Sequence, residues 1–182
     1  KAARFVQLGS AGYEEAIAVG LADRPVRAAN SLGVFDIAIA VWSVAMIIAL
    51  ARDLRGMMGN EEHGIWDRDR RFQRELRGST VGFWGYGGLA RTTARQCKAL
   101  DFKVHVLARN GVKPRPNHFL VKGTGDPEGT LPDRVFNMDQ KKEFLGGLDF
   151  LIVAMPATPA SIGSIGAADL HMLPRHACLL NP

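Results

Sequence analysis

The chain has 182 residues, of which 47% are hydrophobic and 23% are charged, and its formal net charge is +5 with a sequence pI near 9.6. This length suits one domain, or one domain with part of another, and the composition excludes a disordered or fibrous protein. The basic balance does not indicate nucleic-acid binding, because the densest arginine run, residues 68–77, interleaves acids with bases.

The cysteines and histidines indicate neither disulfides nor a metal site. Cys97 and Cys178 lie in apolar segments, where we expect buried, reduced thiols, and this fits a cytoplasmic location. The five histidines are isolated, so we expect no metal ligands. No signal peptide is visible, although Lys1 is not an initiator methionine.

The first 30 residues read as a piece of a larger lobe. We expect a short strand over 1–8, a glycine-bearing loop over 9–13, a helix over 14–21 and a strand over 25–29. A unit of about 30 residues is too small to bury a stable core. We therefore expect this segment to depend on other parts of a protein for its packing.

Residues 35–52 form the most apolar segment and predict a long helix. Asp36 suits its beginning, whereas Arg52 and Arg55 suit its end. Because it is apolar on nearly every side, we expect it to be buried on nearly every side, in a core that a second subunit can share. The apolar run is shorter than the roughly 20 residues that span a membrane. The polar connector over 56–79 should be anchored by Ile65 and Trp66.

Residues 80–90, TVGFWGYGGLA, are the most informative stretch. An apolar strand enters a glycine cluster, a helix over 89–100 follows, and a second strand covers 103–108. This order is the front half of a dinucleotide-binding βαβ unit. The alternative is a strand-to-helix turn that needs small residues for packing alone.

Each small residue of this turn has an expected role. Gly85 would make the tight turn, Gly87 would let the backbone approach a pyrophosphate, and Ala90 would let helix pack on strand. The free N–H groups of Gly88, Leu89 and Ala90 would then face the phosphate charge.

The rest of the chain continues the alternation of strands and helices. A Pro/Gly-rich excursion over 110–134 reads as a surface loop. We expect a helix over 138–146, an apolar strand over 148–155, a helix over 165–173 and a strand from 177 to 181. The pattern predicts an α/β fold with a Rossmann-type, doubly wound parallel sheet.

Several ordered motifs resemble the D-isomer-specific 2-hydroxyacid dehydrogenase family over nearly the whole chain. That family has a glycine substrate loop, an Asn-x-x-Gly-Val turn before a long helix, a Trp-bearing connector, a Leu-x-Gly-x-Thr-Val-Gly strand into GxGxxG, and a strand ending in Pro-x-Thr-Pro. The corresponding segments here are 10–13, 30–34, 64–66, 76–82, 85–90 and 155–159, and 179–182 resembles the strand before the catalytic segment. One departure is Val41, where many relatives carry Glu.

The resemblance implies an NAD(P)-dependent oxidoreductase that interconverts a D-2-hydroxy acid and a 2-oxo acid by hydride transfer. It implies that 1–32 is a fragment of a flavodoxin-like substrate lobe and 33–182 a nucleotide-binding domain, with 35–54 at a homodimer interface. No membrane and no nucleic-acid partner is implied.

The resemblance also implies site residues. The N–H groups near Ser10, Ala11 and Gly12 would hold the substrate carboxylate, although a plain strand-to-helix turn is the alternative. Pro156 and Thr158 would lie beside the nicotinamide ribose, with a local cap as the alternative for Thr158. The cofactor-binding set is Gly85, Tyr86, Gly87, Gly88, Leu89, Ala108, Arg109, Asn110, Met155, Pro156 and Thr158.

The cofactor choice depends on the end of the second strand. NAD-using members carry an acid there, whereas this chain has Ala108 followed by Arg109 and Asn110. Loss of the acid and gain of a guanidinium favour NADP, with NAD as the second choice. Arg109 pointing to solvent is the alternative.

The family's catalytic Arg, Glu and His match no position up to Pro182, so no catalytic residue is assigned. His171 and His176 are expected to be surface or packing residues, and we expect residues 1–182 alone to be inactive. The alternative function is a dinucleotide-sensing, non-catalytic binding module, resembling a corepressor or a truncated relic. Another Rossmann enzyme, such as an amino-acid dehydrogenase, would not explain the motifs together.

Overall fold

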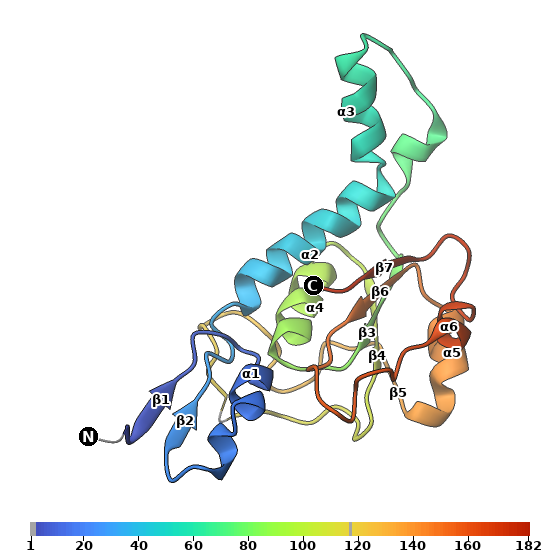
Figure 1. Cartoon of the computed structure of the whole chain (residues 1–182). Helices are drawn as coiled ribbons and strands as arrows, with labels where there is room; N and C mark the ends of the chain where they lie inside the picture. Colours follow the sequence, from blue (N-terminus) through green and yellow to red (C-terminus); the bar gives the residue numbers. More distant parts are fainter. Residues whose placement is uncertain (1–2, 117) are drawn as a thin grey trace.

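A five-stranded parallel sheet forms the body of the computed structural model, which describes residues 3–116 and 118–182 (Figure 1). The strand order is β5-β4-β3-β6-β7, and every neighbouring pair is parallel. The predicted α/β fold with a parallel sheet is confirmed. The strands are β3 (Thr80–Trp84), β4 (Lys103–Leu107), β5 (Arg134–Phe136), β6 (Phe150–Val153) and β7 (Cys178–Leu180).

Helices cover both faces of this sheet, as a doubly wound fold requires. Helices α2 (Asp36–Ala51) and α4 (Gly88–Ala99) lie on one face, and α5 (Lys141–Gly146) and α6 (Ala167–Leu170) lie on the other (Figure 1). Each face has its own apolar cluster, because side chains alternate along a strand. The first cluster includes Ile47, Phe83, Ala94, Val104 and Ile152, and the second includes Trp84, Leu107, Phe136, Phe144 and Leu151.

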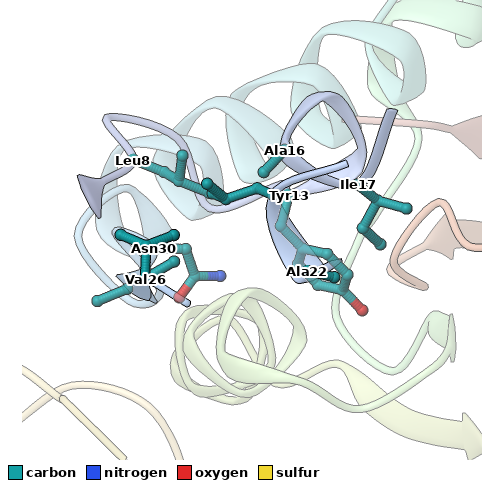
Figure 2. Close-up of a pocket in the computed structure, with 10 residues that line it drawn as sticks. Leu8, Tyr13, Ala16, Ile17, Ala22, Val26 and Asn30 are labelled. Carbon is teal, nitrogen blue, oxygen red and sulfur yellow. The ribbon is translucent and has the colours of Figure 1, made fainter. Parts of the chain in front are cut away.

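The N-terminal segment has no core of its own, as predicted. Strands β1 (Phe5–Gln7) and β2 (Arg27–Ala29) form a separate parallel pair, joined through α1 (Glu14–Ala18) and the 3-10 turn η1 (Leu21–Asp23). None of residues 3–32 is buried. A groove of about 330 Å³ lies between these elements, lined by apolar side chains such as Leu8, Tyr13, Ile17 and Val26 (Figure 2).

Helix α2 is less buried than its composition predicted. Asp36, Ala40, Ser43, Ile47 and Ala51 are buried, but Val41, Trp42 and Leu50 remain 55%, 45% and 50% exposed. The prediction of burial on nearly every side is wrong for the single chain, because the sheet and α4 cover one face alone.

The connector after α2 also differs from its prediction. Residues 54–62 form helix α3 (Leu54–Glu62), which begins after Asp53, whose side chain accepts a 3.2 Å hydrogen bond from the Gly56 N–H. Trp66 is 89% exposed and Ile65 is 56% exposed, so neither residue anchors the connector within the chain. Helix α3 projects from the body at the end of α2, which itself packs on α4, and the two helices together form the α2–α3 arm (Figure 1).

A membrane-spanning helix is not found among the described residues. No single helix there is both long and apolar enough, and the one pair that passes together, α2 with α3, is bent by 65°.

The excursion after β4 contains one unexpected strand and a buried centre. Strand β5 pairs with β4 and is followed by the 3-10 turn η3 (Met138–Gln140), while a further turn, η2 (Arg70–Gln73), precedes β3. Asp126 is 3% exposed, so the expectation of a plain surface loop is wrong for the middle of this segment.

The two cysteines differ in burial. Both are free thiols, but Cys97 is fully buried and Cys178 is partly exposed. Burial raises the pKa of the Cys97 thiol to about 12, so the thiol stays protonated. Cys97 therefore packs as a small apolar side chain.

Candidate functional site

A cleft of about 350 Å³ lies at the carboxyl ends of β3, β4 and β6. Open parallel sheets bind ligands at this edge. Most of the predicted cofactor-binding residues line the cleft, and Gly87, Gly88 and Leu89 follow directly at the start of α4. The lining consists of Trp84, Gly85, Tyr86, Leu107, Ala108, Arg109, Asn110, Met138, Met155, Pro156, Thr158, Ala160, Ser161 and Ser164.

The glycine turn has the backbone geometry that its sequence predicted. Gly85 has φ +95°, and a Cβ built there would lie 2.9 Å from the carbonyl oxygen of Ala154. Its N–H donates a 2.9 Å hydrogen bond to the carbonyl of Leu107. Both the conformation and the close approach of β6 therefore require glycine here.

Gly87 and Ala90 serve two other purposes. Gly87 has an extended backbone, and the nearest atom to a Cβ built there is Nη1 of Arg115, 3.8 Å away. Glycine is therefore not required here by backbone conformation, and its missing side chain leaves open space at the start of α4. Ala90 is fully buried, which confirms its predicted role in packing α4 on the sheet.

The first turn of α4 presents unused donors. The first bond of the helix is donated by the N–H of Arg91 to the carbonyl of Gly87, at 3.0 Å. The N–H groups of Gly88, Leu89 and Ala90 therefore have no acceptor within the helix. Together with the helix dipole, they give this end of the 12-residue helix a positive potential that favours an anion.

The Tyr86 side chain holds the excursion instead of standing free in the cleft. It is 9% exposed, and its hydroxyl donates a 2.8 Å hydrogen bond to Asp126. The Asp126 carboxylate also accepts hydrogen bonds from the N–H groups of Gly129, Thr130 and Leu131. Burial and this carboxylate raise the pKa of Tyr86 well above its usual range, so the phenol stays neutral.

Arg91 completes this buried network. It is 5% exposed and donates hydrogen bonds to the carbonyls of Tyr86 (3.2 Å), Lys113 (2.6 Å) and Asp126. Burial lowers its pKa, an effect that the nearby Tyr86 and Asp126 oppose. Neither Arg91 nor Asp126 was predictable as part of the site, because their partners lie far away along the chain.

The end of β4 brings Ala108, Arg109 and Asn110 to the cleft. The Ala108 N–H donates a 3.0 Å hydrogen bond to the carbonyl of Phe136, which fixes the main chain at the cleft. Arg109 follows as an exposed side chain that forms no ion pair within 3–116 and 118–182. No acidic residue is among those that line the cleft in the described part of the chain.

Thr158 belongs to a local hydrogen-bonded turn and to the cleft at once. Its N–H donates to the Ser161 hydroxyl at 2.8 Å, and the two hydroxyl oxygens are 3.2 Å apart. The Ser161 hydroxyl also contacts the carbonyl of Pro156 at 2.5 Å. The cap that was the alternative for Thr158 is therefore present, beside a side chain that also lines the cleft.

The predicted substrate loop lies away from this cleft. None of Ser10, Ala11 and Gly12 lines it. Their loop is held by Asn30, whose side-chain amide donates 2.7 Å to the carbonyl of Ala11, and by the Ser31 N–H, which donates 2.9 Å to the carbonyl of Ser10. The structure thus does not bring Ser10, Ala11 and Gly12 into the lining of the cleft.

Comparison with protein families identifies one matching model. The model described as D-isomer specific 2-hydroxyacid dehydrogenase, NAD binding domain, matches residues 44–182. The D-3-phosphoglycerate dehydrogenase of Methanocaldococcus jannaschii is 25% identical over 189 residues, and that of Archaeoglobus fulgidus is 27% identical over 158. These alignments cover 100% and 87% of this chain, but 32% and 27% of the two relatives.

Solved structures show the same fold. An NADPH-dependent glyoxylate/hydroxypyruvate reductase from Sinorhizobium meliloti, in complex with NADP and sulfate, matches with a TM-score of 0.75 at 23% identity. An acyclic imino acid reductase in complex with NADPH and D-Arg matches with a TM-score of 0.79 at 17% identity. Each match covers 98% of this chain and 52% of the other, so the chain spans about half the length of these structures.

Proposed function

The chain belongs to the D-isomer specific 2-hydroxyacid dehydrogenase family, and from this premise we propose that it binds NADP, with NAD as the second choice. The bound nicotinamide would accept or return the hydride that interconverts a D-2-hydroxy acid and a 2-oxo acid. The unused N–H groups at the start of α4, beside the glycine turn and the cleft, are the observation that carries this proposal.

The residues present fit a dinucleotide. The pyrophosphate would lie against the N–H groups of Gly88 and Leu89, where Gly87 leaves open space above the backbone. The adenosine half would lie towards Ala108 and Arg109, and the nicotinamide half towards Pro156. The dinucleotide would thus extend along the carboxyl edge of the sheet, from the end of β4 past the glycine turn to the end of β6.

The preference for NADP rests on charge. An acid at the position of Ala108 would repel a 2′-phosphate by up to about 4 kcal/mol at 4 Å with an effective dielectric of 20. Arg109 instead offers an exposed guanidinium that can bind a phosphate through two parallel hydrogen bonds.

Two further parts of the proposal concern partners. The N–H groups of Ser10, Ala11 and Gly12 would hold the substrate carboxylate once the two site regions close together. The α2–α3 arm would pack against a second copy of the chain, because its exposed apolar side chains include Val41, Trp42 and Met58.

A second candidate function is dinucleotide binding without catalysis. Among the residues that line the cleft in the described chain, Arg109 alone carries a charge, and the hydroxyl of Tyr86 is already bonded to Asp126. This favours a binding role for residues 1–182 by themselves.

Calorimetric titration of the purified chain with NADP and NAD tests the proposal. We expect saturable binding of both, tighter for NADP. The hydride transfer is proposed for the whole protein, and we expect residues 1–182 alone to oxidise no member of a panel of D-2-hydroxy acids. Absence of binding for either dinucleotide would reject the proposed function. Turnover by this chain would reject the binding-only candidate.

A further inference from the structure

The excursion after β4 is fixed against the glycine turn by its own backbone. The Arg115 N–H donates a 2.8 Å hydrogen bond to the carbonyl of Pro127, and Arg91 binds the carbonyl of Lys113 at 2.6 Å. Arg91 is itself buried, so its side chain is a fixed anchor for the carbonyl of Lys113. Residues 113–115 therefore keep a defined position relative to α4.

This position places the Arg115 guanidinium at the glycine turn. Its Nη1 is 3.8 Å from a Cβ built on Gly87, the residue that leaves open space at the start of α4. Arg115 is half-buried, and it makes no ion pair within 4.0 Å in the described ranges. Its charge is thus available beside the unused N–H groups of the helix.

A carboxylate also lies against this turn, at Gly88. Asp36, in the first turn of α2, is 9% exposed, and a Cβ built on Gly88 would overlap its Oδ2. Its side chain accepts no hydrogen bond from the residues that the structure describes. Burial raises the pKa of this carboxyl, and the positive charge of Arg115 partly opposes the rise.

We propose that Arg115 binds the pyrophosphate of the dinucleotide and that the carboxylate of Asp36 weakens this binding. In the unbound chain this carboxylate balances the positive charge of Arg115 and of the start of α4. Partial burial of the Asp36 carboxylate is unfavourable, and the N-terminus of α4 with Arg115 is the positive environment that offsets the cost. A pyrophosphate in the same place gains the N–H groups and a bidentate guanidinium. It also meets the negative charge of Asp36 at close range. This inference rests on the proposed function.

Titrations with four ligands test the role of Arg115. For Arg115→Gln we expect about tenfold to hundredfold weaker binding of NADP, NAD and ADP-ribose alike, and unchanged binding of adenosine 2′-monophosphate. Lys113→Gln, an exposed neighbour on the same excursion, is the matched control and should bind all four as the parent chain does. Arg115→Lys keeps the positive charge but cannot form two parallel hydrogen bonds, so it should give an intermediate loss of dinucleotide affinity.

The outcomes separate this inference from the function on which it rests. If the parent chain binds no dinucleotide, the proposed function fails. If the parent binds and Arg115→Gln binds equally well, or loses NADP alone, the pyrophosphate role of Arg115 is overturned.

Asp36→Asn tests the counter-charge. It removes the carboxylate charge at nearly constant shape, so we expect severalfold tighter binding of NADP, NAD and ADP-ribose. Unchanged or weaker binding overturns the role of Asp36. Thermal unfolding of each variant checks that the fold is retained.

Discussion

The hydroxyl of Tyr86 donates a 2.8 Å hydrogen bond to the carboxylate of Asp126, which lies 40 positions further along the chain. The bond joins the glycine turn to the middle of the excursion, and both partners are buried. The turn that would receive a phosphate is therefore supported by a segment without helix or strand.

Loss of this hydroxyl should destabilise the fold. We expect Tyr86→Phe to lower the free energy of unfolding by about 1–3 kcal/mol, because a buried carboxylate loses one of its donors. Urea denaturation measures the change. Tyr13→Phe, at a 40% exposed tyrosine of the N-terminal segment, should change stability by less than about 0.5 kcal/mol. Equal effects of the two substitutions would contradict the assignment.

The same carboxylate should make stability depend on pH. Burial alone would raise the pKa of Asp126, but the Leu131 and Thr130 N–H groups, the Tyr86 hydroxyl and the charge of Arg91 outweigh it and hold this pKa below its usual range. A carboxyl whose pKa is lower in the folded state stabilises the fold above its unfolded pKa. This stabilisation is lost as pH falls through the folded value.

We therefore expect the stability difference between the parent chain and Asp126→Asn to be full at neutral pH. It should shrink as pH falls from about 5 towards 2. Urea denaturation across this range measures the difference, with the exposed Asp23→Asn as control. A difference that stays constant with pH would exclude the linkage.

The two glycines of the turn should respond differently to alanine. Gly85→Ala forces a side chain into φ +95° and towards the Ala154 carbonyl, so we expect a loss of at least about 1 kcal/mol in unfolding free energy. Gly87→Ala has an allowed backbone and room for its Cβ, so stability should hold while dinucleotide affinity falls. Denaturation and calorimetric titration of both variants separate the two roles, and the reverse pattern would refute them.

The charge at the end of β4 should set cofactor preference. We expect Arg109→Gln to weaken NADP binding by about tenfold or more and to leave NAD binding unchanged, because the 2′-phosphate loses a charge-assisted partner. Ala108→Asp should reverse the preference towards NAD. Titration with each dinucleotide gives the ratio of the two dissociation constants. A ratio that neither substitution alters would place the 2′-phosphate elsewhere.

The exposed face of α2 should mediate self-association. Trp42 is 45% exposed on a helix whose other face packs on the sheet, so we expect Trp42→Glu to convert a dimer to a monomer. Sedimentation velocity at micromolar concentration measures the state. Val19→Glu, at a 68% exposed apolar residue outside the arm, should leave the dimer intact. A parent chain that is already monomeric would end this part of the proposal.

The glycine turn and the main strands were predictable because their signals are local. Gly85 follows an apolar strand at a fixed spacing, and β3, β4 and β6 lie within the predicted segments. Strand β5 was missed because three residues after a Pro/Gly-rich stretch carry too little alternation. The cytoplasmic location and the substrate role of Ser10, Ala11 and Gly12 stay predictions.

Contacts between distant segments were not predictable from the residues alone. Nothing in the pattern around Asp126 indicates that Tyr86 and Arg91 reach it, or that Arg115 lies at Gly87. The apolar composition of α2 likewise does not say which surface covers each side of the helix. The sheet covers one side, and Trp42 remains exposed on another.

The parallel arrangement of the sheet also bears on how the chain acquires its shape. Val81 in the central strand pairs with Val104 on one side and with Phe150 on the other, so no sheet pair forms through a simple hairpin. Long loops must close before the centre of the sheet is complete, which makes folding slow. During synthesis the apolar residues of β3 emerge before β6, so that side of the central strand stays unpaired until about 70 further residues have been added.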